Sequence, residues 1–197
     1  MLTADPFANF LLAFRTQVST VRPRDRWRHA LLDGLAEYRA LANLVAGTSL
    51  GDGLLTFHTS DNGDRYKALL HDAFPGFRTA IPFAHDWLGR QFAVRSTATG
   101  NEVLIFEPGS GESFETGFDF LRFFSEAIVA SPDLYLETEF YGAWRANGGA
   151  APRDGYCIGF RAPLFLGGRG EVDNLEETDM DVYWHLCGEL IRAIRDQ

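Results

Sequence analysis

The stretch Glu102–Glu107 reads EVLIFE, with four consecutive apolar residues between two glutamates. A strand with one solvent-facing side alternates apolar and polar residues, so this uninterrupted run predicts a strand that is buried on both faces. Similar strand-like segments precede it at residues 54–59, 79–84 and 91–96, and turns separate them. The predicted strands therefore cluster between residues 54 and 107.

Predicted helices lie before, within and after this cluster. Apolar residues recur every three or four positions over residues 6–18 and 27–45, and a shorter helix is expected over 64–74. Residues 117–130 and 131–146 predict two further helices. Because strands and helices are largely segregated, we expect an α+β fold with a central, mostly antiparallel mixed sheet flanked by helices.

The last third of the chain predicts an irregular or edge strand over residues 156–166, because Pro163 interrupts it, and then a terminal helix. Thr178 and Asp181 approximate a capping box at the start of that helix. The spacing predicts an outward face of Asp181, His185, Glu189 and Arg192, and an inward face of Met180, Tyr183, Trp184, Cys187, Leu190, Ile191 and Ile194.

Composition indicates a folded chain with one core. Of the 197 residues, 46% are hydrophobic and 17 are phenylalanine, which is enough to bury a good-sized core, so we expect residues 1–197 to form a single compact unit. No apolar run approaches the roughly 20 residues that a membrane helix needs, and the first residues do not resemble a signal peptide. Cys157 and Cys187 are expected to be buried thiols. These features favour a cytoplasmic protein.

Charge is distributed very unevenly along the chain. The formal net charge is −9; residues 1–100 hold 11 Lys/Arg and 9 Asp/Glu, whereas residues 101–197 hold 7 and 18. An acidic half repels nucleic acids and membrane surfaces and attracts basic partners, although such charge also serves simply to keep a protein soluble. We therefore expect neither a nucleic-acid nor a membrane partner.

No residue pattern supports a catalytic, metal or cofactor site. His185, Cys187 and Cys157 form the only grouping with a hint of zinc ligation, but His185 and Cys187 are predicted on opposite helix faces. His85 and Asp86 resemble a base and its orienting acid, yet neighbours on a strand point to opposite faces. The glycine-rich stretches 47–53 and 167–170 lack a phosphate-binding pattern and predict turns. We expect no catalytic residue, metal or cofactor.

The most distinctive segment is acidic. Residues 171–181 read EVDNLEETDMD, in which six of eleven residues are acidic and none is basic. Glu177, Asp179 and Asp181 are predicted around the start of the last helix, where the helix dipole stabilises them, and this accounts for about half of the cluster. The remainder predicts an anionic surface for a cationic partner. The candidate partner-binding residues are Glu171, Asp173, Glu176, Glu177, Asp179 and Asp181.

Two passages resemble a known bacterial family. The C-terminal passage comprises 156–165 (YCIGFRAPLF), 166–168 (LGG), 171–176 (EVDNLE), 178–184 (TDMDVYW) and 187–188 (CG). It resembles the C-terminal signature of a family of immunity proteins against type VI secretion DNase toxins. Residues 50–55 (LGDGLL) and 82–92 (PFAHDWLGRQF) are similar to the GAD-like domain that accompanies it. The pattern also resembles the broader superfamily of bacterial immunity proteins that includes the yeast cell-wall regulator Smi1/Knr4.

This resemblance implies a GAD-like part over about residues 27–110 and an immunity-type part over about 117–197, within a Smi1/Knr4-like fold. It implies stoichiometric neutralisation of a cognate type VI or related toxin, without turnover. Charge adds the hypothesis that the toxin is a nuclease with a basic active-site surface. Two alternatives stay open: an intracellular adaptor of the same fold for a cellular partner, and a hydrolase with a carboxylate or His85-based site.

Overall fold

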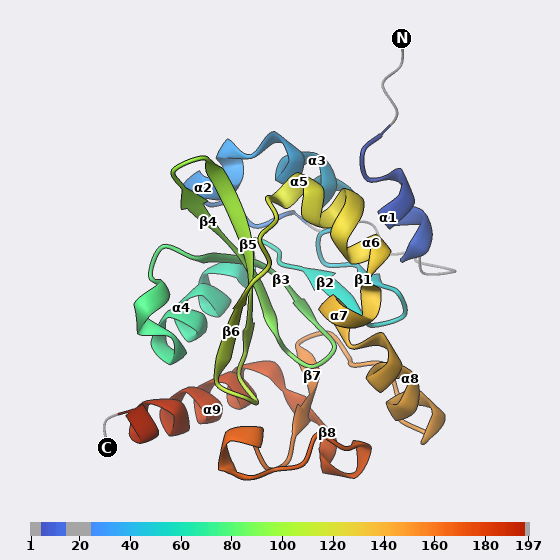
Figure 1. Cartoon of the computed structure of the whole chain (residues 1–197), viewed down its shortest axis with the longest axis vertical. Coiled ribbons are helices and arrows are strands. Elements are labelled where there is room, and N and C mark those ends of the chain that lie inside the picture. The colour runs from blue at the N-terminus through green and yellow to red at the C-terminus, as the bar shows by residue number, and fades with distance from the viewer. Residues whose placement is uncertain (1–4, 15–24, 196–197) are drawn as a thin grey trace.

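The computed structural model describes residues 5–14 and 25–195. Its centre is a six-stranded sheet in which each strand pairs antiparallel with the next along the chain (Figure 1). The strands are β1 (Ser49–Leu50), β2 (Leu55–Phe57), β3 (Ile81–Asp86), β4 (Gln91–Thr97), β5 (Gly100–Glu107) and β6 (Glu112–Glu115). The α+β class and the antiparallel sheet flanked by helices are confirmed.

The β4–β5 hairpin has the longest pairing in the sheet, in a register that runs from Gln91 opposite Phe106 to Thr97 opposite Gly100. Within β5, Val103 and Ile105 join the core on one face, whereas Leu104 and Phe106 join the core on the other. All four are buried, so the expectation drawn from EVLIFE is confirmed.

One face of the sheet, which we call the aromatic face, is covered by helices from residues 8–45 and 120–130. They are α1 (Ala8–Ala13), α2 (Ala30–Gly34), α3 (Ala36–Val45), α5 (Phe120–Arg122), the π-helical turn Phe123–Ala127 and α6 (Ile128–Ala130). Phe124 lies at the centre of this core, and its ring centroid is 4.9 to 5.9 Å from those of Phe10, Phe57, Phe83 and Phe120.

The opposite face, which we call the polar-core face, is covered by α4 (Gly63–Ala73) and α9 (Met180–Arg195). The two helices approach closely, because a Cβ added at Gly188 would lie 3.3 Å from the Ala73 Cβ. This face also buries polar side chains of the strands, among them His58, His85 and Gln91.

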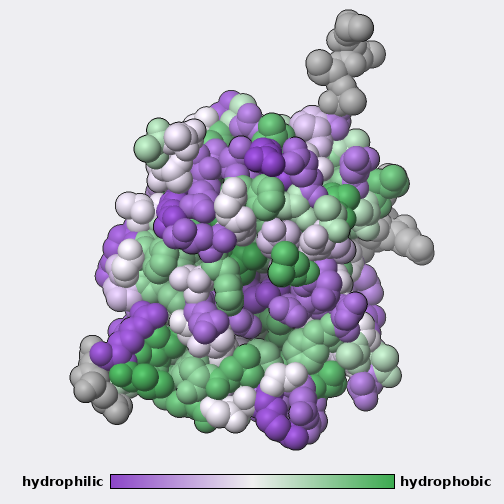
Figure 2. All heavy atoms as spheres, viewed as in Figure 1, coloured by the Kyte–Doolittle hydropathy of each residue, from purple (hydrophilic) through white to green (hydrophobic). Residues whose placement is uncertain are grey.

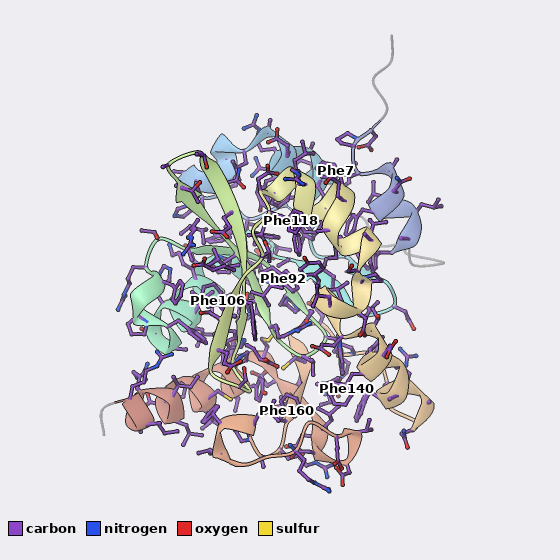
Figure 3. The ribbon with its side chains drawn as sticks, viewed as in Figure 1. Phe7, Phe92, Phe106, Phe118, Phe140 and Phe160 are labelled. Atoms are coloured by element: carbon purple, nitrogen blue, oxygen red, sulfur yellow. The ribbon has the colours of Figure 1, made fainter. Side chains whose placement is uncertain are left out.

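The remaining elements close the end of the sheet where β3 turns into β4. They are α7 (Pro132–Leu136), α8 (Thr138–Ala146), the antiparallel hairpin of β7 (Tyr156–Phe160) and β8 (Leu175–Asp179), and the 3-10 turns η3 (Leu164–Leu166) and η4 (Val172–Asn174). A further 3-10 turn, η1 (Pro75–Phe77), follows α4 and packs with the polar-core face. Trp87, in the β3–β4 turn, connects the sheet to α7 and β7. Its Nε1 donates to the Leu136 carbonyl at 2.8 Å, and its own carbonyl accepts from the Ile158 amide at 2.7 Å. Phe140 and Phe160 lie close together here (Figure 3), with ring centroids 6.4 Å apart.

Several predicted boundaries are wrong. The helix expected over 27–45 is interrupted at Leu35, which has extended backbone angles, and begins only at Ala30. The helix expected over 131–146 is interrupted at Glu137, which adopts a left-handed conformation with φ +50°. Strand β6 was not predicted, and of the helix expected over 6–18 residues 15–18 lie outside the described residues.

The terminal helix is confirmed, but two details differ. Asp179, not Thr178, caps it, because its Oδ1 accepts from the amides of Asp181 and Val182 at 3.0 and 3.1 Å. Leu190 and Ile194 are exposed, since α9 carries a second apolar line on its outer side. No helix in the described ranges combines the length and apolarity needed to cross a bilayer.

Candidate functional site

The acidic segment 171–181 spans three elements: η4, the whole of β8 and the start of α9. Pairing of β8 with β7 places Glu176 opposite Gly159, Glu177 opposite Ile158 and Asp179 opposite Tyr156. Glu177 therefore lies in a strand and not at the helix terminus, which corrects the prediction for that residue. The hairpin register fixes where these carboxylates point.

Arginines accompany most of the six predicted carboxylates. Arg169 contacts both Glu171, at 3.1 Å, and Asp173, at 2.6 Å. Arg161 contacts Glu176 at 3.3 Å. The segment is therefore a row of ion pairs and not a bare anionic patch.

The pairs at the end of β8 follow the same pattern. The Arg153 guanidinium lies 2.9 Å from Glu177, and its hydrogen bonds lower the pKa of that carboxyl. Arg65, from α4, lies 3.1 Å from Asp181. Burial nevertheless raises the pKa of Asp181, and Arg65 opposes that shift. Ion pairs on the surface are worth about 0–1 kcal/mol each, so an arriving cation displaces such a partner at little cost.

A hollow of about 510 Å³ separates α8 from the acidic segment. Its lining comprises Trp144, Asn147, Arg161, Val172, Asp173, Leu175, Glu176 and Glu177. It brings together three of the six predicted residues, Asp173, Glu176 and Glu177, whereas Glu171, Asp179 and Asp181 lie outside it. We call it the β8 hollow.

A second hollow of about 440 Å³ lies beside Phe140, nearer the start of α8. Its lining comprises Leu88, Glu107, Asp133, Glu137, Glu139, Phe140, Phe160, Leu164 and Gly170. We call it the Glu137 cleft. None of its four carboxylates was predicted, because they come from the end of β5 and from α7–α8, and no local spacing in the sequence connects these segments.

Within this cleft Glu137 is held close to other acids. Burial, together with the charges of Glu107 and Asp133, raises the pKa of Glu137, and Arg90 opposes that shift. Arg90 Nη1 lies 3.4 Å from the Glu137 carboxylate. Arg90 is also engaged with Asp86, whose Oδ2 accepts from its Nε at 2.6 Å, so its charge is shared. The cleft therefore has less compensation for its carboxylates than the β8 hollow.

The Asp86–Arg90 pair is buried, and its hydrogen bonds to the backbone give it a structural role. Asp86 Oδ1 accepts from the Leu88 and Arg90 amides, and Arg90 Nη2 donates to the Tyr135 carbonyl at 2.9 Å. Burial raises the pKa of Asp86 to about 6, and Arg90 opposes that shift. The pair ties the β3–β4 turn to α7.

His85 points away from Asp86, toward α4. Its ring centroid lies 5.4 Å from that of His58 and 5.7 Å from that of Tyr66. His58 Nε2 lies 2.7 Å from Gln91 Oε1. Burial lowers the pKa of His85 to about 4 and that of His58 well below its usual value. A base and its orienting acid are therefore not assembled from His85 and Asp86.

The cysteines do not build a metal centre with the histidines. Cys157 and Cys187 are buried free thiols, as expected, and burial raises the pKa of both. His185 is exposed on the other side of α9. No group of three or more potential ligands that could hold a metal ion occurs in residues 5–14 and 25–195.

Comparison with known proteins gives one structural and one family finding. The crystal structure of Atu4351 from Agrobacterium tumefaciens is similar to this chain, with a TM-score of 0.66 and 12% identity over 93% of this chain and 88% of that one. At that identity the likeness shows a shared fold. No curated protein matched the chain. Residues 120–191, which include α7, α8, the β7–β8 hairpin and most of α9, match the family described as "T6SS immunity protein Tdi1, C-terminal".

Proposed function

We propose that this chain is an immunity protein of a type VI secretion system, which binds a cognate toxin in the cytoplasm and neutralises it without turnover. The observation that carries this proposal is the family match over residues 120–191. We further propose that residues 27–110 and 117–197 are the GAD-like and immunity-type parts of one Smi1/Knr4-like unit.

The matched residues contribute most of the acidic surface described above. Every residue that lines the β8 hollow lies within 120–191, and so do seven of the nine that line the Glu137 cleft. Helix α8 borders both hollows, through Trp144 on one side and Phe140 on the other. We therefore place the toxin-binding surface at this end of the molecule, with Glu171, Asp173, Glu176, Glu177, Asp179 and Asp181 along its rim.

Electrostatics supports a basic partner. Arg153, Arg161 and Arg169 are exposed, so their pairs with the acidic segment exchange readily for lysine or arginine side chains of a toxin. The four carboxylates of the Glu137 cleft add charge that draws a cation toward the surface. A nuclease has a basic surface where it holds its substrate's phosphates, and this is the toxin class that we favour.

Co-expression with the toxin-like reading frame nearest the gene tests the function. Survival of the bacteria together with a stoichiometric complex is the expected result. Failure of both rescue and complex formation contradicts the immunity function and favours an adaptor for a cellular partner. Turnover of a small substrate that His85→Ala abolishes would instead favour a hydrolase.

Charge reversal tests whether the acidic surface binds the toxin, separately from whether the chain is an immunity protein. Glu176→Lys with Glu177→Lys is expected to slow association with the toxin at least tenfold at low salt, and less at high salt, because the attraction is screened. Glu126→Lys is a matched control, since Glu126 is also exposed and paired with an arginine, Arg122. Asp179 is a poor choice, because it caps α9. If the double variant binds as fast as the control, the acidic surface is wrong while the immunity function stands.

A further inference from the structure

The outer edge of strand β8 is open. Within the described residues β8 pairs with β7 alone, and the two strands form a separate sheet. Just beyond the two ends of this pairing, the Arg161 amide donates to the Asn174 carbonyl at 2.8 Å and the Met180 amide donates to the Gly155 carbonyl at 3.0 Å. Hydrogen-bonded and non-hydrogen-bonded pairs alternate along an antiparallel ladder, so every second residue of β8 turns its backbone groups toward β7. The residues between them, with Glu177 at their centre, turn their backbone groups outward.

The corresponding residues of β7 turn their amides to the opposite edge, where the amides are satisfied. The Ile158 amide donates to the Trp87 carbonyl at 2.7 Å, and the Phe160 amide donates to the Tyr183 hydroxyl at 3.2 Å. Glu177 lies opposite Ile158, but neither its amide nor its carbonyl has a hydrogen-bond partner in the described parts of the chain. A strand edge with a free N–H and a free C=O is a template for a further strand.

The β8 hollow runs along this open edge. Consecutive residues of a strand point to opposite faces, and the hollow nevertheless touches Leu175, Glu176 and Glu177 alike, so it follows the edge of β8 and not one face. Trp144, on α8, stands across the hollow, and its Nε1 is held by the Ala150 carbonyl at 2.8 Å. The segment from η3 to β8 lies at the lower end of the molecule, where hydrophilic residues gather (Figure 2). The edge is therefore open to solvent, with α8 as a wall beside it.

We infer that an extended segment of the toxin pairs with the outer edge of β8, between β8 and α8, and becomes the third strand of the β7–β8 sheet. This inference rests on the proposed function. Arg161 and Arg153 already hold the carboxylates of Glu176 and Glu177, so the charges of the strand do not by themselves select the occupant. The backbone does, because an extended chain supplies a carbonyl for the Glu177 amide and an amide for the Glu177 carbonyl at the same time.

The surroundings of the edge favour the toxin over a second copy of this chain. A second copy would have to bring its own α8 and η4, which flank its own β8, into the same hollow. Every residue that lines the hollow also belongs to the stretch that matches the immunity family.

Strand β6 also has an outward-facing backbone, and it provides a comparison. The Thr116 amide donates to the Val103 carbonyl at 3.2 Å, so by the same alternation the backbone groups of Ser113 face away from β5. Residues of β6 line neither of the two hollows, and they lie outside the family match. The edge of β6 is therefore the matched control for the edge of β8.

Proline substitution tests the pairing. Glu177→Pro removes the outward amide but leaves the bonds to β7, because proline is tolerated in an edge strand where the N–H faces solvent. Binding to the purified product of the toxin-like reading frame nearest the gene is expected to weaken about 10- to 100-fold, since a toxin carbonyl loses its donor. Glu177→Gln keeps the amide and is expected to bind within about fivefold of the unaltered chain. Ser113→Pro, the same change on β6, is expected to bind like the unaltered chain. Circular dichroism establishes that the variants fold.

Hydrogen exchange of the unaltered chain tests the pairing without any variant. The toxin is expected to slow exchange of the Glu177 amide at least about tenfold and to leave the Ser113 amide unchanged. Unaltered binding by Glu177→Pro, or a Glu177 amide that stays unprotected in the complex, overturns the inference while the immunity function stands. Protection of this amide in the chain alone as its concentration rises assigns the edge to a second copy, and also overturns it. An unaltered chain that binds no toxin overturns the inference and the proposed function together.

Discussion

The two faces of the central sheet are built from the same strands but have different chemistry. On the aromatic face, Phe57 and Phe83 point into a core of phenylalanines. On the polar-core face, His58, which follows Phe57, and His85, two residues after Phe83, meet Gln91 and Tyr66 under α4. Three of their nitrogens, His58 Nδ1, His85 Nδ1 and Gln91 Nε2, are buried there and have no hydrogen-bond partner among residues 5–14 and 25–195.

The two faces of the sheet therefore contribute to stability in different ways. The phenylalanines of the aromatic core contribute free energy of folding that depends little on pH, because they carry no ionisable group. Buried imidazoles stabilise the folded protein only while they stay neutral, because burial disfavours their charged form. The aromatic face is therefore expected to set the overall stability, and the polar-core face to set its dependence on conditions.

The largest effect is expected on the aromatic face. Phe124→Ala removes a ring that contacts five other phenylalanines and leaves a cavity, so the free energy of unfolding should fall by about 4 kcal/mol. Urea unfolding measures it. Phe114→Ala, on the edge strand β6, is the matched control and should cost less than about 1 kcal/mol, because Phe114 is exposed. Equal losses in the two variants would contradict the assignment of the core.

The next effect concerns the buried ion pair at the end of the sheet. Arg90→Met leaves the Asp86 carboxylate buried without its guanidinium and should cost about 3 kcal/mol in the same measurement. Adding Asp86→Asn should recover part of the loss, because the amide oxygen still accepts from the Leu88 and Arg90 amides. No recovery would mean that Arg90 acts through its bond to the Tyr135 carbonyl.

Acid should weaken the polar-core face specifically. The pKa of His85 is lowered to about 4, so in the folded protein it stays neutral while the unfolded chain takes up a proton below its ordinary value of 6.5. Its contribution to stability is complete above pH 6.5 and is lost as the pH falls toward 4. Between about pH 7.5 and pH 5, His85→Gln should reduce the acid-induced loss of unfolding free energy by about 2 kcal/mol.

The test compares how the unfolding free energy of the His85→Gln variant and of the unaltered chain depends on pH. The raised pKa of Asp86 acts in the opposite direction, since the folded protein binds that proton more readily than the unfolded chain, and it is present in both. Parallel stability profiles for the variant and the unaltered chain would show that His85 does not titrate as its burial requires.

The smallest effect is expected on the surface of the β7–β8 hairpin, outside both faces of the sheet. Glu176→Gln weakens the pair with Arg161, in which both side chains are more than half exposed, so the unfolding free energy should change by less than about 0.5 kcal/mol. Urea unfolding again measures it. A loss of about 2 kcal/mol would show that the acidic strand serves the fold, which leaves it less free to serve a partner.

Much of the fold follows from local patterns in the sequence. The run at Val103–Phe106 and the spacing from Met180 to Ile191 identified a strand buried on both faces and the terminal helix. The breaks at Leu35 and Glu137 were not predictable, because local helical spacing continues through both positions. Leu190 and Ile194 were misassigned because periodicity cannot distinguish two apolar lines on one helix.

The candidate site was less predictable than the fold. The acidic segment stands out in the sequence, but its arginine partners do not, since Arg153 reaches Glu177 only through the hairpin register. The Glu137 cleft joins acids from β5 and from α7–α8, which only the folded chain brings together. Neither the Arg153–Glu177 ion pair nor the Glu137 cleft can be recognised from neighbouring residues in the sequence.

Asp179 is at once the last residue of β8 and the cap of α9. The strand and the helix therefore share one side chain, whose carboxylate protects the backbone amides of Asp181 and Val182. A protein that binds to β8 and restrains Asp179 should slow deuterium uptake at the Asp181 and Val182 amides, even if it contacts neither of them. The exchange rate of the first turn of α9 thus reports whether a protein is bound on the acidic strand, and mass spectrometry can read it without a covalent tag.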